Sequence, residues 1–190
     1  MPKVSDEHRA GRRRQILDAA ARCFTRNGFH RTSMQDIVRE SGISVGLVYR
    51  YFAGKDDMIT AIVTDWHDQR QAVLAAAPTV PEAAAGYLDL LRAIGDPAGR
   101  ERLRLGVQIW AEAVRSPHIA EVARRNVDDP RAAVAELLRR SGTPVGDPDG
   151  LARVLIAIHQ GLQLQTAWDE AVDNASFVAA VAALLDGLTG

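Results

Sequence analysis

The feature that most constrains the fold is a pair of short amphipathic segments within residues 33–52, separated by Ser41-Gly42-Ile43. Thr32 and Ser33 are both good N-caps for the first segment, and Asp36 stands three residues after Ser33 in a variant of the capping box. Gly42 ends this segment and lets two helices meet at a steep angle. The apolar residues that can pack the two inner faces together are Ile37, Val38, Ile43 and Val48.

The outward face of the second segment, expected to be a helix from Ser44 to Phe52, carries Val45, Gly46, Tyr49 and Arg50. In a helix-turn-helix, the N-terminal residues of such a helix enter the DNA major groove while the preceding helix crosses the phosphate backbone. Val45 and Gly46 can only contact a thymine methyl or allow close approach, because they have no hydrogen-bonding side chain. Arg50 and Gln35 are therefore the candidates for hydrogen bonds to base edges.

Polar groups that suit phosphates surround these two segments. Thr32 and Ser33 place hydroxyls and free N–H groups at a helix start. Lys55 falls in the first turn of the next helix, where a cation opposes the helix dipole and a bound phosphate would remove the conflict. Tyr49 and Tyr51 offer phenol donors, although Tyr51 fits the core equally well and Phe52 fits it better. The run Arg12, Arg13 and Arg14 either clamps the DNA backbone, reaches the minor groove or is simply solvated.

Helical periodicity continues along the chain without a convincing strand, so we predict an all-α fold of about nine helices. Residues 1–11 are expected to be a flexible basic arm, 12–57 a helix-turn-helix domain and 58–190 a second helical domain. After a helix at 12–27 and the two segments above, further helices are predicted at about 55–76, 81–94, 98–115, 118–141, 150–170 and 175–188.

The charge distribution agrees with a polyanion-binding N-terminal part. Residues 1–60 carry 11 Lys and Arg against 7 Asp and Glu, whereas residues 61–190 carry 12 against 17. Chance asymmetry is the alternative, because the net charge of the whole chain is only −1. A single cysteine, Cys23, excludes an intramolecular disulfide. With no signal peptide and no run of about 18 apolar residues, we expect a cytoplasmic protein without a membrane span.

Residues 64–190 contain two apolar stripes near the C-terminus that a four-helix bundle made by two chains would bury. An intrachain core is the alternative. The predicted dimer-interface residues are Val154, Ile158, Gly161, Leu162, Gln165, Phe177, Val181, Leu184, Leu185 and Leu188.

A small-molecule pocket in the same part of the chain would be lined by apolar, aromatic and a few polar side chains. The candidates are Trp66, Tyr87, Gln108, Trp110, Val114, His159 and Gln163, each of which also fits an ordinary core or surface position. His159 has no second histidine or carboxylate at ligand spacing, so neither a metal nor a cofactor is predicted.

The N-terminal residues together resemble a known family. Arg13 to Ala20, Phe24, Gly28-Phe29, Thr32 to Ile37, Ser41 to Phe52 and Gly54 to Met58 are similar to the DNA-binding domain of the TetR family of bacterial regulators, over about residues 12–63. The resemblance implies a homodimer on a palindromic operator, with a ligand pocket and dimer interface in the C-terminal part. By position, Thr32, Ser33, Tyr51 and Lys55 match its phosphate contacts. Gln35, Ser44, Val45, Gly46, Tyr49 and Arg50 match positions that face bases or nearby backbone.

The leading hypothesis is a repressor released when an unidentified small-molecule effector favours a body conformation that mis-spaces the two recognition helices. The alternative is a DNA-binding regulator without an effector, which a solidly filled pocket would favour. An enzyme is disfavoured, because the chain has no P-loop, dinucleotide fingerprint, metal-ligand cluster or nucleophile motif.

Overall fold

The computed structural model describes residues 6–75, 79–96 and 99–189, with the side chains of 69–75, 100, 101, 188 and 189 left out. Within these ranges the chain forms nine helices and no strand, as the sequence predicted. The helices are α1 (Asp6–Asn27), α2 (Met34–Ser41), α3 (Val45–Tyr51), α4 (Lys55–Ala75), α5 (Val80–Ile94), α6 (Arg100–Ala113), α7 (Pro117–Ser141), α8 (Pro148–Trp168) and α9 (Asn174–Thr189).

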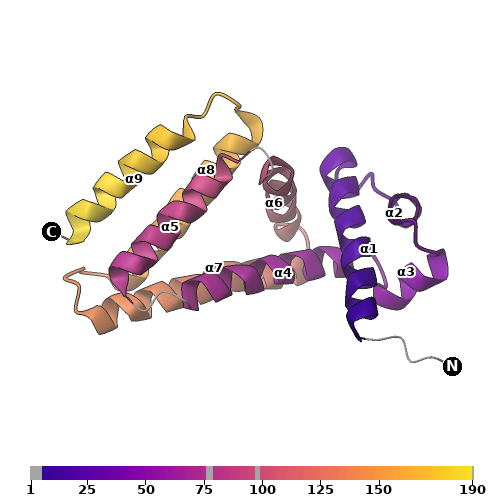
Figure 1. Ribbon diagram of the computed structural model, residues 1–190, viewed down its shortest axis with the longest axis horizontal. Helices are drawn as coiled ribbons and strands as arrows, with labels where there is room; N and C mark the ends of the chain where they lie inside the picture. Colours follow the sequence, from indigo (N-terminus) through magenta and orange to yellow (C-terminus); the bar gives the residue numbers. More distant parts are fainter. Residues whose placement is uncertain (1–5, 76–78, 97–98, 190) are drawn as a thin grey trace.

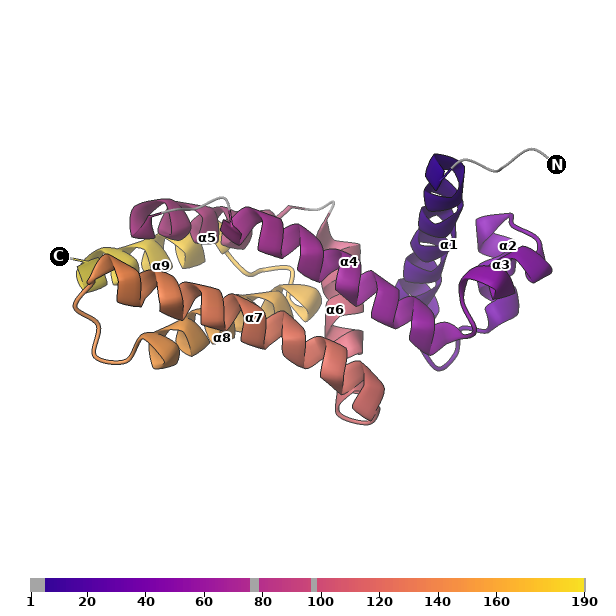
Figure 2. The ribbon, with the colours of Figure 1, turned by 90° about the horizontal axis from the view of Figure 1, so that it is seen from below.

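Helices α1 to α3 form a small unit at one end of the molecule (Figure 1). The long helix α4 leads away from this unit and runs beside α7 (Figure 2). Helices α5, α8 and α9 lie at the other end, and α6 lies between the two ends. The helix-turn-helix therefore projects from an elongated helical body and is joined to it through α4 and α6.

Two clusters of buried apolar residues hold the helices together. The first cluster begins with Ile16, Phe24 and Val48 and continues through α4 into α6 and α7, where it includes Ile109 and Ile119. The second cluster joins α5, α6, α8 and α9. Packing is thus continuous across the predicted domain boundary at 57/58, which falls inside α4.

The prediction of a flexible arm over residues 1–11 is wrong for residues 6–11, which form the first turns of α1. These residues contain no apolar periodicity, so a search for an amphipathic pattern starts the helix too late. Asp6 and Glu7 in the first turn favour a helix start there, because acidic side chains stabilise the positive end of the helix dipole. Residues 1–5 lie outside the described residues.

Candidate nucleic-acid interface

The start and end of α2 are fixed by the local interactions that the sequence predicts. The Ser33 hydroxyl accepts a hydrogen bond from the Asp36 backbone N–H at 3.1 Å, and the Asp36 carboxylate accepts one from the Ser33 N–H at 2.9 Å. The Ser33 hydroxyl also donates to the Asp36 carboxylate at 2.7 Å, and this bond, together with the one from the Ser33 N–H, lowers the pKa of Asp36. Gly42 follows α2 with a φ of 65°, in the left-handed region that favours glycine. The turn between α2 and α3 is therefore confirmed.

Polar side chains of α1 contact the C-terminal end of α2, next to this turn. The Gln15 amide donates to the Ser41 carbonyl at 2.8 Å. Arg22 and Arg26 form ion pairs with Glu40 at 2.8 and 3.0 Å, and their hydrogen bonds lower the pKa of Glu40. None of these three contacts was predicted from the sequence, because each joins α1 to α2 and has no local sequence signal.

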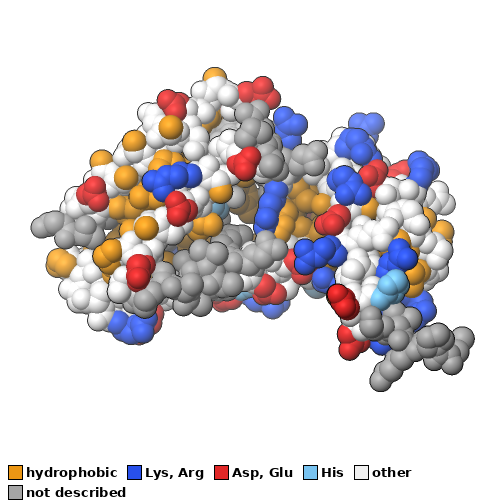
Figure 3. All heavy atoms as spheres, in the orientation of Figure 1, with side chains coloured by type: hydrophobic (Ala, Val, Ile, Leu, Met, Phe, Trp, Pro, Cys, Tyr) orange, Lys and Arg blue, Asp and Glu red, His pale blue; other side chains and the backbone are white. Residues whose placement is uncertain are grey.

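Helix α3 is held by its inner face and exposes its outer face, as predicted. Val48 is fully buried, and Ile43 and Phe52 on either side of α3 are also in the core. The exposed positions include those predicted to face bases or the nearby backbone, namely Gln35, Ser44, Val45, Gly46, Tyr49 and Arg50. Ser44 occupies the N-cap position, but its side chain makes no capping hydrogen bond. Lys and Arg side chains gather over the α1 to α3 end of the molecule, mixed with acidic ones (Figure 3).

Thr32 is a correction to the predicted phosphate contacts. Its side chain is 1% exposed. The hydroxyl lies 3.1 Å from the Cys23 carbonyl and 2.8 Å from the Gly28 carbonyl, to which it donates. This hydroxyl fastens the loop to the end of α1 and cannot reach a phosphate. Ser33, beside it, is exposed, and its hydroxyl donates to the Asp36 carboxylate at 2.7 Å, so its phosphate contact stays a prediction.

Lys55 and Tyr51 are both half-buried. The Lys55 ammonium donates to the Phe29 carbonyl at 2.8 Å and lies 4.6 Å from the centroid of the Phe29 ring. These contacts stabilise a cation at the start of α4 without a phosphate. Because an ammonium has three donors, a phosphate contact by Lys55 stays a prediction. Tyr51 packs against the first core cluster, and its predicted phosphate contact also remains a prediction.

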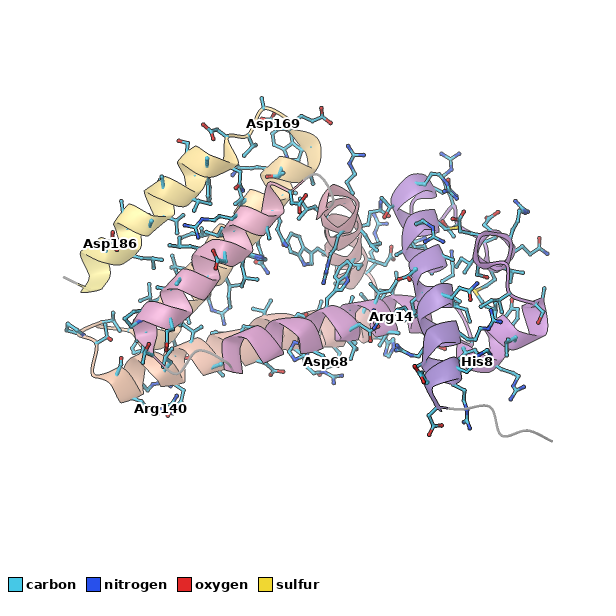
Figure 4. All side chains as sticks on the ribbon, viewed as in Figure 1. His8, Arg14, Asp68, Arg140, Asp169 and Asp186 are labelled. Atoms are coloured by element: carbon cyan, nitrogen blue, oxygen red, sulfur yellow. The ribbon has the colours of Figure 1, made fainter. Side chains whose placement is uncertain are left out.

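The three arginines of α1 have different surroundings. Arg12 donates to the Gln15 side chain at 3.0 Å. Arg13 lies 3.3 Å from Asp65 of α4, and its guanidinium is 5.8 Å from the centroid of the Phe52 ring. Arg13 is thus engaged between α1, α3 and α4, unlike a simple solvated side chain. Arg14 is exposed and lines, with Arg13, Asp65 and Asp68, a cleft of about 500 Å³ between α1 and α4 (Figure 4).

Histidines join the helix-turn-helix end and α4 to the body. His30, in the loop after α1, lies 2.9 Å from the buried carboxylate of Glu112 in α6. Along α4, the Thr60 hydroxyl is 3.1 Å from the His118 ring, and the His67 ring is 3.1 Å from Asp129 of α7. A shift of α6 or α7 therefore acts on groups that hold the DNA-binding helices and α4.

The predicted pocket residues do not form one group. Trp110 and Val114 line an open groove of about 640 Å³ between α6, α7 and α8, and Val114 is 87% exposed. The described lining of this groove contains none of the other five candidates. Tyr87 donates to the Leu155 carbonyl at 2.7 Å, and burial raises the pKa of its phenol. Tyr87 therefore joins α5 to α8.

The remaining pocket candidates are only partly exposed. The Trp66 ring has the Arg102 guanidinium 4.9 Å from its centroid, and burial lowers the pKa of Arg102. The Gln108 carbonyl oxygen is buried without a hydrogen-bond partner. His159 and Gln163, on α8, are half-buried. The seven candidates therefore do not line one described cavity, and an effector pocket formed by them stays a prediction.

In the predicted dimer stripe, Leu162 and Val181 are buried in the second core cluster, so the intrachain alternative holds for them. Ile158, Phe177 and Leu185 are only partly buried against that cluster, so their place at a dimer interface stays a prediction. The residues in or against the second core cluster are Ile158, Leu162, Phe177, Val181 and Leu185. Periodicity identified their apolar face but not that α5 covers it. Of the other predicted positions, Val154, Gln165 and Leu184 are exposed and Gly161 is half-buried. The side chain of Leu188 lies outside the described residues, and the exposed apolar residues Leu164 and Trp168 were missed.

No described helix combines the length and the apolarity that a membrane crossing requires. An all-α body bearing an exposed recognition helix defines a DNA-binding transcription regulator of the helix-turn-helix type. Residues 16–62 match the family described as bacterial regulatory proteins, tetR family, and residues 83–190 match BetI-type transcriptional repressor, C-terminal. The chain belongs to the TetR family of bacterial regulators.

Relatives of this chain are also regulators by name. It is 27% identical to the HTH-type transcriptional regulator UidR of Escherichia coli K12, over 93% of this chain and 92% of UidR. It is 34% identical to the uncharacterized HTH-type transcriptional regulator YfiR of Bacillus subtilis, over 62% and 61%. It is 38% identical to the HTH-type transcriptional repressor Rv1474c of Mycobacterium tuberculosis, over 38% and 39%. The matched region thus spans less than two thirds of the last two relatives.

Solved structures share the fold. GusR of Salmonella enterica superimposes with a TM-score of 0.76 at 27% identity, over 99% of both chains. A putative transcriptional regulator of Saccharomonospora viridis, solved in complex with choline, gives a TM-score of 0.75 over 93% of this chain and 96% of that one. At 23% identity, the second likeness concerns the fold alone.

Proposed function

We propose that this chain acts in the cytoplasm as a homodimeric repressor that binds a palindromic operator and is released from it by a small-molecule effector. The observation that carries the proposal is the exposed face of α3, supported by buried Val48 and by the Gly42 turn. Preorganised side chains on a rigid helix read base edges, whereas the surrounding donors position the protein on the phosphates.

The exposed residues divide into two kinds of contact. Arg50 and Gln35 carry the hydrogen bonds to bases, and Val45 and Gly46 allow close approach to the groove floor. At the start of α2, beside the exposed Ser33, the free N–H groups of the first turn bind a phosphate. The other backbone contacts come from Tyr51, Lys55, Arg12 and Arg14.

The homodimer is supported by an exposed apolar stripe on α8, defined by Val154, Gly161, Leu164 and Trp168. A methyl group added at Gly161 would meet nothing within 4 Å, so open space lies beside the helix at that point. Leu184 of α9 is 62% exposed and is a further apolar side chain on the surface of the C-terminal helices. Two copies related by a two-fold axis bury the same stripe on each subunit and place two recognition helices on the two halves of a palindrome.

The effector is supported by unsatisfied polar atoms in the body and by the surface between α5 and α6, which is hollowed and shows hydrophobic side chains (Figure 3). The buried Gln108 carbonyl oxygen and the buried Thr166 hydroxyl have no hydrogen-bond partner, and such atoms gain from a ligand or a water. Because Arg102 already places a cation at the Trp66 ring, a neutral or anionic effector fits there better than a cationic one.

Operator binding is tested by selecting bound duplexes from a random library, and release by titrating probes against the labelled selected site. Choline and short-chain carboxylates are suitable probes of opposite charge. We expect an enriched palindrome and release by a carboxylate or a neutral compound rather than by choline. Failure to enrich any sequence would overturn the proposal that the chain is an operator-binding regulator. If an operator is enriched but no probe releases the protein from it, a regulator without an effector is favoured.

A further inference from the structure

The groove between α6, α7 and α8 has an unusual combination of exposed side chains. Its apolar wall is formed by Trp110 of α6 and Val114, which directly follows α6, with Ala120, Ala123 and Val127 of α7. Val114 is 87% exposed, although it lies at the end of a helix whose other apolar residues include the core members Leu105 and Ile109. Such apolar exposure, rimmed by polar residues, is typical of an interaction site.

The polar rim of the groove is partly unpaired. Arg124 forms an ion pair with Glu121 in its own helix. Arg153 of α8 is exposed, and no ion pair joins it to another residue in the described part of the chain. Gln160, about two helical turns after Arg153 on α8, completes this edge of the groove. Asp128 of α7 also lines the groove and pairs with Arg131 at 3.6 Å. The groove thus offers the cation of Arg153 and an amide beside an aromatic and aliphatic wall.

The groove adjoins the apolar stripe of α8 defined above, because Arg153 and Gln160 directly precede two stripe residues, Val154 and Gly161. Trp168, which ends α8, is 71% exposed. The two residues that follow it are acidic, Asp169 and Glu170, and Asp169 marks this end of α8 in Figure 4. The same helix therefore carries an exposed aromatic side chain, Trp168, at one end and, near the other, Arg153 at the edge of an aromatic-walled groove.

We infer that a second copy of this chain fills the groove with its own Trp168. If two α8 helices cross antiparallel at Gly161, a residue seven positions beyond the crossing faces one seven positions before it. Trp168 of one subunit then faces Val154 of the other, about 10 Å from the crossing point at the helical rise of 1.5 Å per residue. Val154 stands next to Arg153, at the mouth of the groove.

Charge complementarity supports this occupant. Asp169, next to the inserted Trp168, comes close to Arg153, whose guanidinium can also stack on the indole ring. The contact rests on the proposed homodimer. It adds to that dimer a large aromatic side chain seated in a pocket, the kind of residue that contributes most of the binding energy at an interface.

The contact also has a consequence for regulation. Trp110 and Val114, which would receive the partner's indole, flank Glu112 on α6, and Glu112 holds His30 of the DNA-binding unit. Docking of the indole therefore acts on the helix that is bonded to the loop between α1 and α2. The dimer contact and the loop between α1 and α2 are thus linked through α6.

The direct test uses two separately tagged versions of the full chain, one carrying Val114→Cys and the other Trp168→Cys, mixed at a concentration at which dimers form. The native Cys23 is buried and leaves the new thiols as the accessible pair. We expect a thiol-to-thiol cross-linker to join the two tags in the mixture and not within either variant alone. Ala111→Cys, exposed but outside the described lining of the groove, replaces Val114→Cys as the matched control.

The outcomes separate this inference from the homodimer itself. A dimer in which the tags are not joined, or are joined equally through Ala111→Cys, overturns the groove contact and leaves the homodimer standing. A chain that stays monomeric at all concentrations overturns both.

A second measurement compares dimer dissociation constants by sedimentation. Trp168→Ala is expected to raise the constant by at least about tenfold, as for other buried aromatic anchors, while Trp168→Phe restores most of the affinity. Val114→Asp should weaken the dimer through repulsion of Asp169, whereas Ala111→Asp should not. Because Trp168 and Val114 are exposed in one chain, the helical content should stay unchanged. Unchanged dimer affinity in both Trp168→Ala and Val114→Asp would contradict the contact.

Discussion

The imidazole of His30 lies 2.9 Å from the carboxylate of Glu112, so the loop that precedes the helix-turn-helix is bonded directly to α6 of the body. The Glu112 carboxylate is buried, whereas the His30 side chain is mostly exposed. This pair gives the body a contact on the DNA-binding unit that is independent of the chain connection through α4.

Replacing His30 by Ala tests that contact. Because the imidazole is largely solvated, we expect the free energy of unfolding to fall by less than about 1 kcal/mol. The change in operator affinity that an effector produces should shrink, since α6 no longer holds the loop. Binding titrations with and without effector, beside the control Glu136→Gln on α7, measure this. An unchanged effector response in His30→Ala would contradict a transmitting role.

Substitutions at Gly42 and Gly46 should have different effects, the first on the stability of the fold and the second on DNA binding. Gly42 has a φ of 65°, so Gly42→Ala should destabilise the fold by about 1–2 kcal/mol. Gly46 has no positive φ and open space around it, so Gly46→Ala should leave stability unchanged or raise it by about 0.5–1 kcal/mol. We expect Gly46→Ala nevertheless to weaken operator binding, because its methyl blocks close approach. Urea unfolding and DNA titration of both variants are the measurements, and equal loss of stability would refute the distinction.

Lys55 can be tested for a phosphate contact through salt dependence. Lys55→Ala should lower affinity for specific and random duplexes alike and reduce the slope of log affinity against log salt by about one unit. It should also cost about 1 kcal/mol of stability through the lost hydrogen bond to the Phe29 carbonyl. Lys55→Arg keeps the charge and should retain the slope. A changed sequence preference in Lys55→Ala would mean that the residue reads bases.

Acid should loosen the α1–α2 unit. Hydrogen bonds from Ser33 lower the pKa of Asp36, and those from Arg22 and Arg26 lower the pKa of Glu40. A lowered carboxyl pKa in the folded state gives stability that is present above the ordinary value and is lost as the pH falls through the lowered one, roughly between pH 5 and pH 2. Asp36→Asn with Glu40→Gln should flatten the decline in the free energy of unfolding over that range. An equally steep decline in the double variant would show that other groups cause it.

The helices around the recognition site were predictable because their signals are local. Ser33 with Asp36 three residues later, and Gly42 at the end, fixed α2, and the alternation of apolar and exposed positions fixed the inner face of α3 at Val48. Each of these depends on residues within one or two turns. The exposed reading face therefore followed from sequence.

What the sequence did not predict depends on contacts between segments that are far apart along the chain. Thr32 looked like a helix cap, but it turns inward onto the Gly28 and Cys23 carbonyls. Arg13 was expected either to contact DNA or to be solvated, and its ion pair with Asp65, 52 residues away, was not predicted. Periodicity showed that Val181 lies on an apolar face, and only the packing of α5 against α9 decides that this face is internal.

Site selection with wild-type protein and Arg50→Ala tests the central claim, that α3 reads a palindrome, most directly. We predict that the wild type enriches two inverted half-sites whose centres are separated by whole helical turns. Arg50→Ala should keep the half-site arrangement and lose preference at one position of each half-site, at a cost of about 1–3 kcal/mol if the contact is bidentate. Enrichment of an asymmetric sequence, or an equal loss of affinity for selected and random duplexes in Arg50→Ala, would contradict the account.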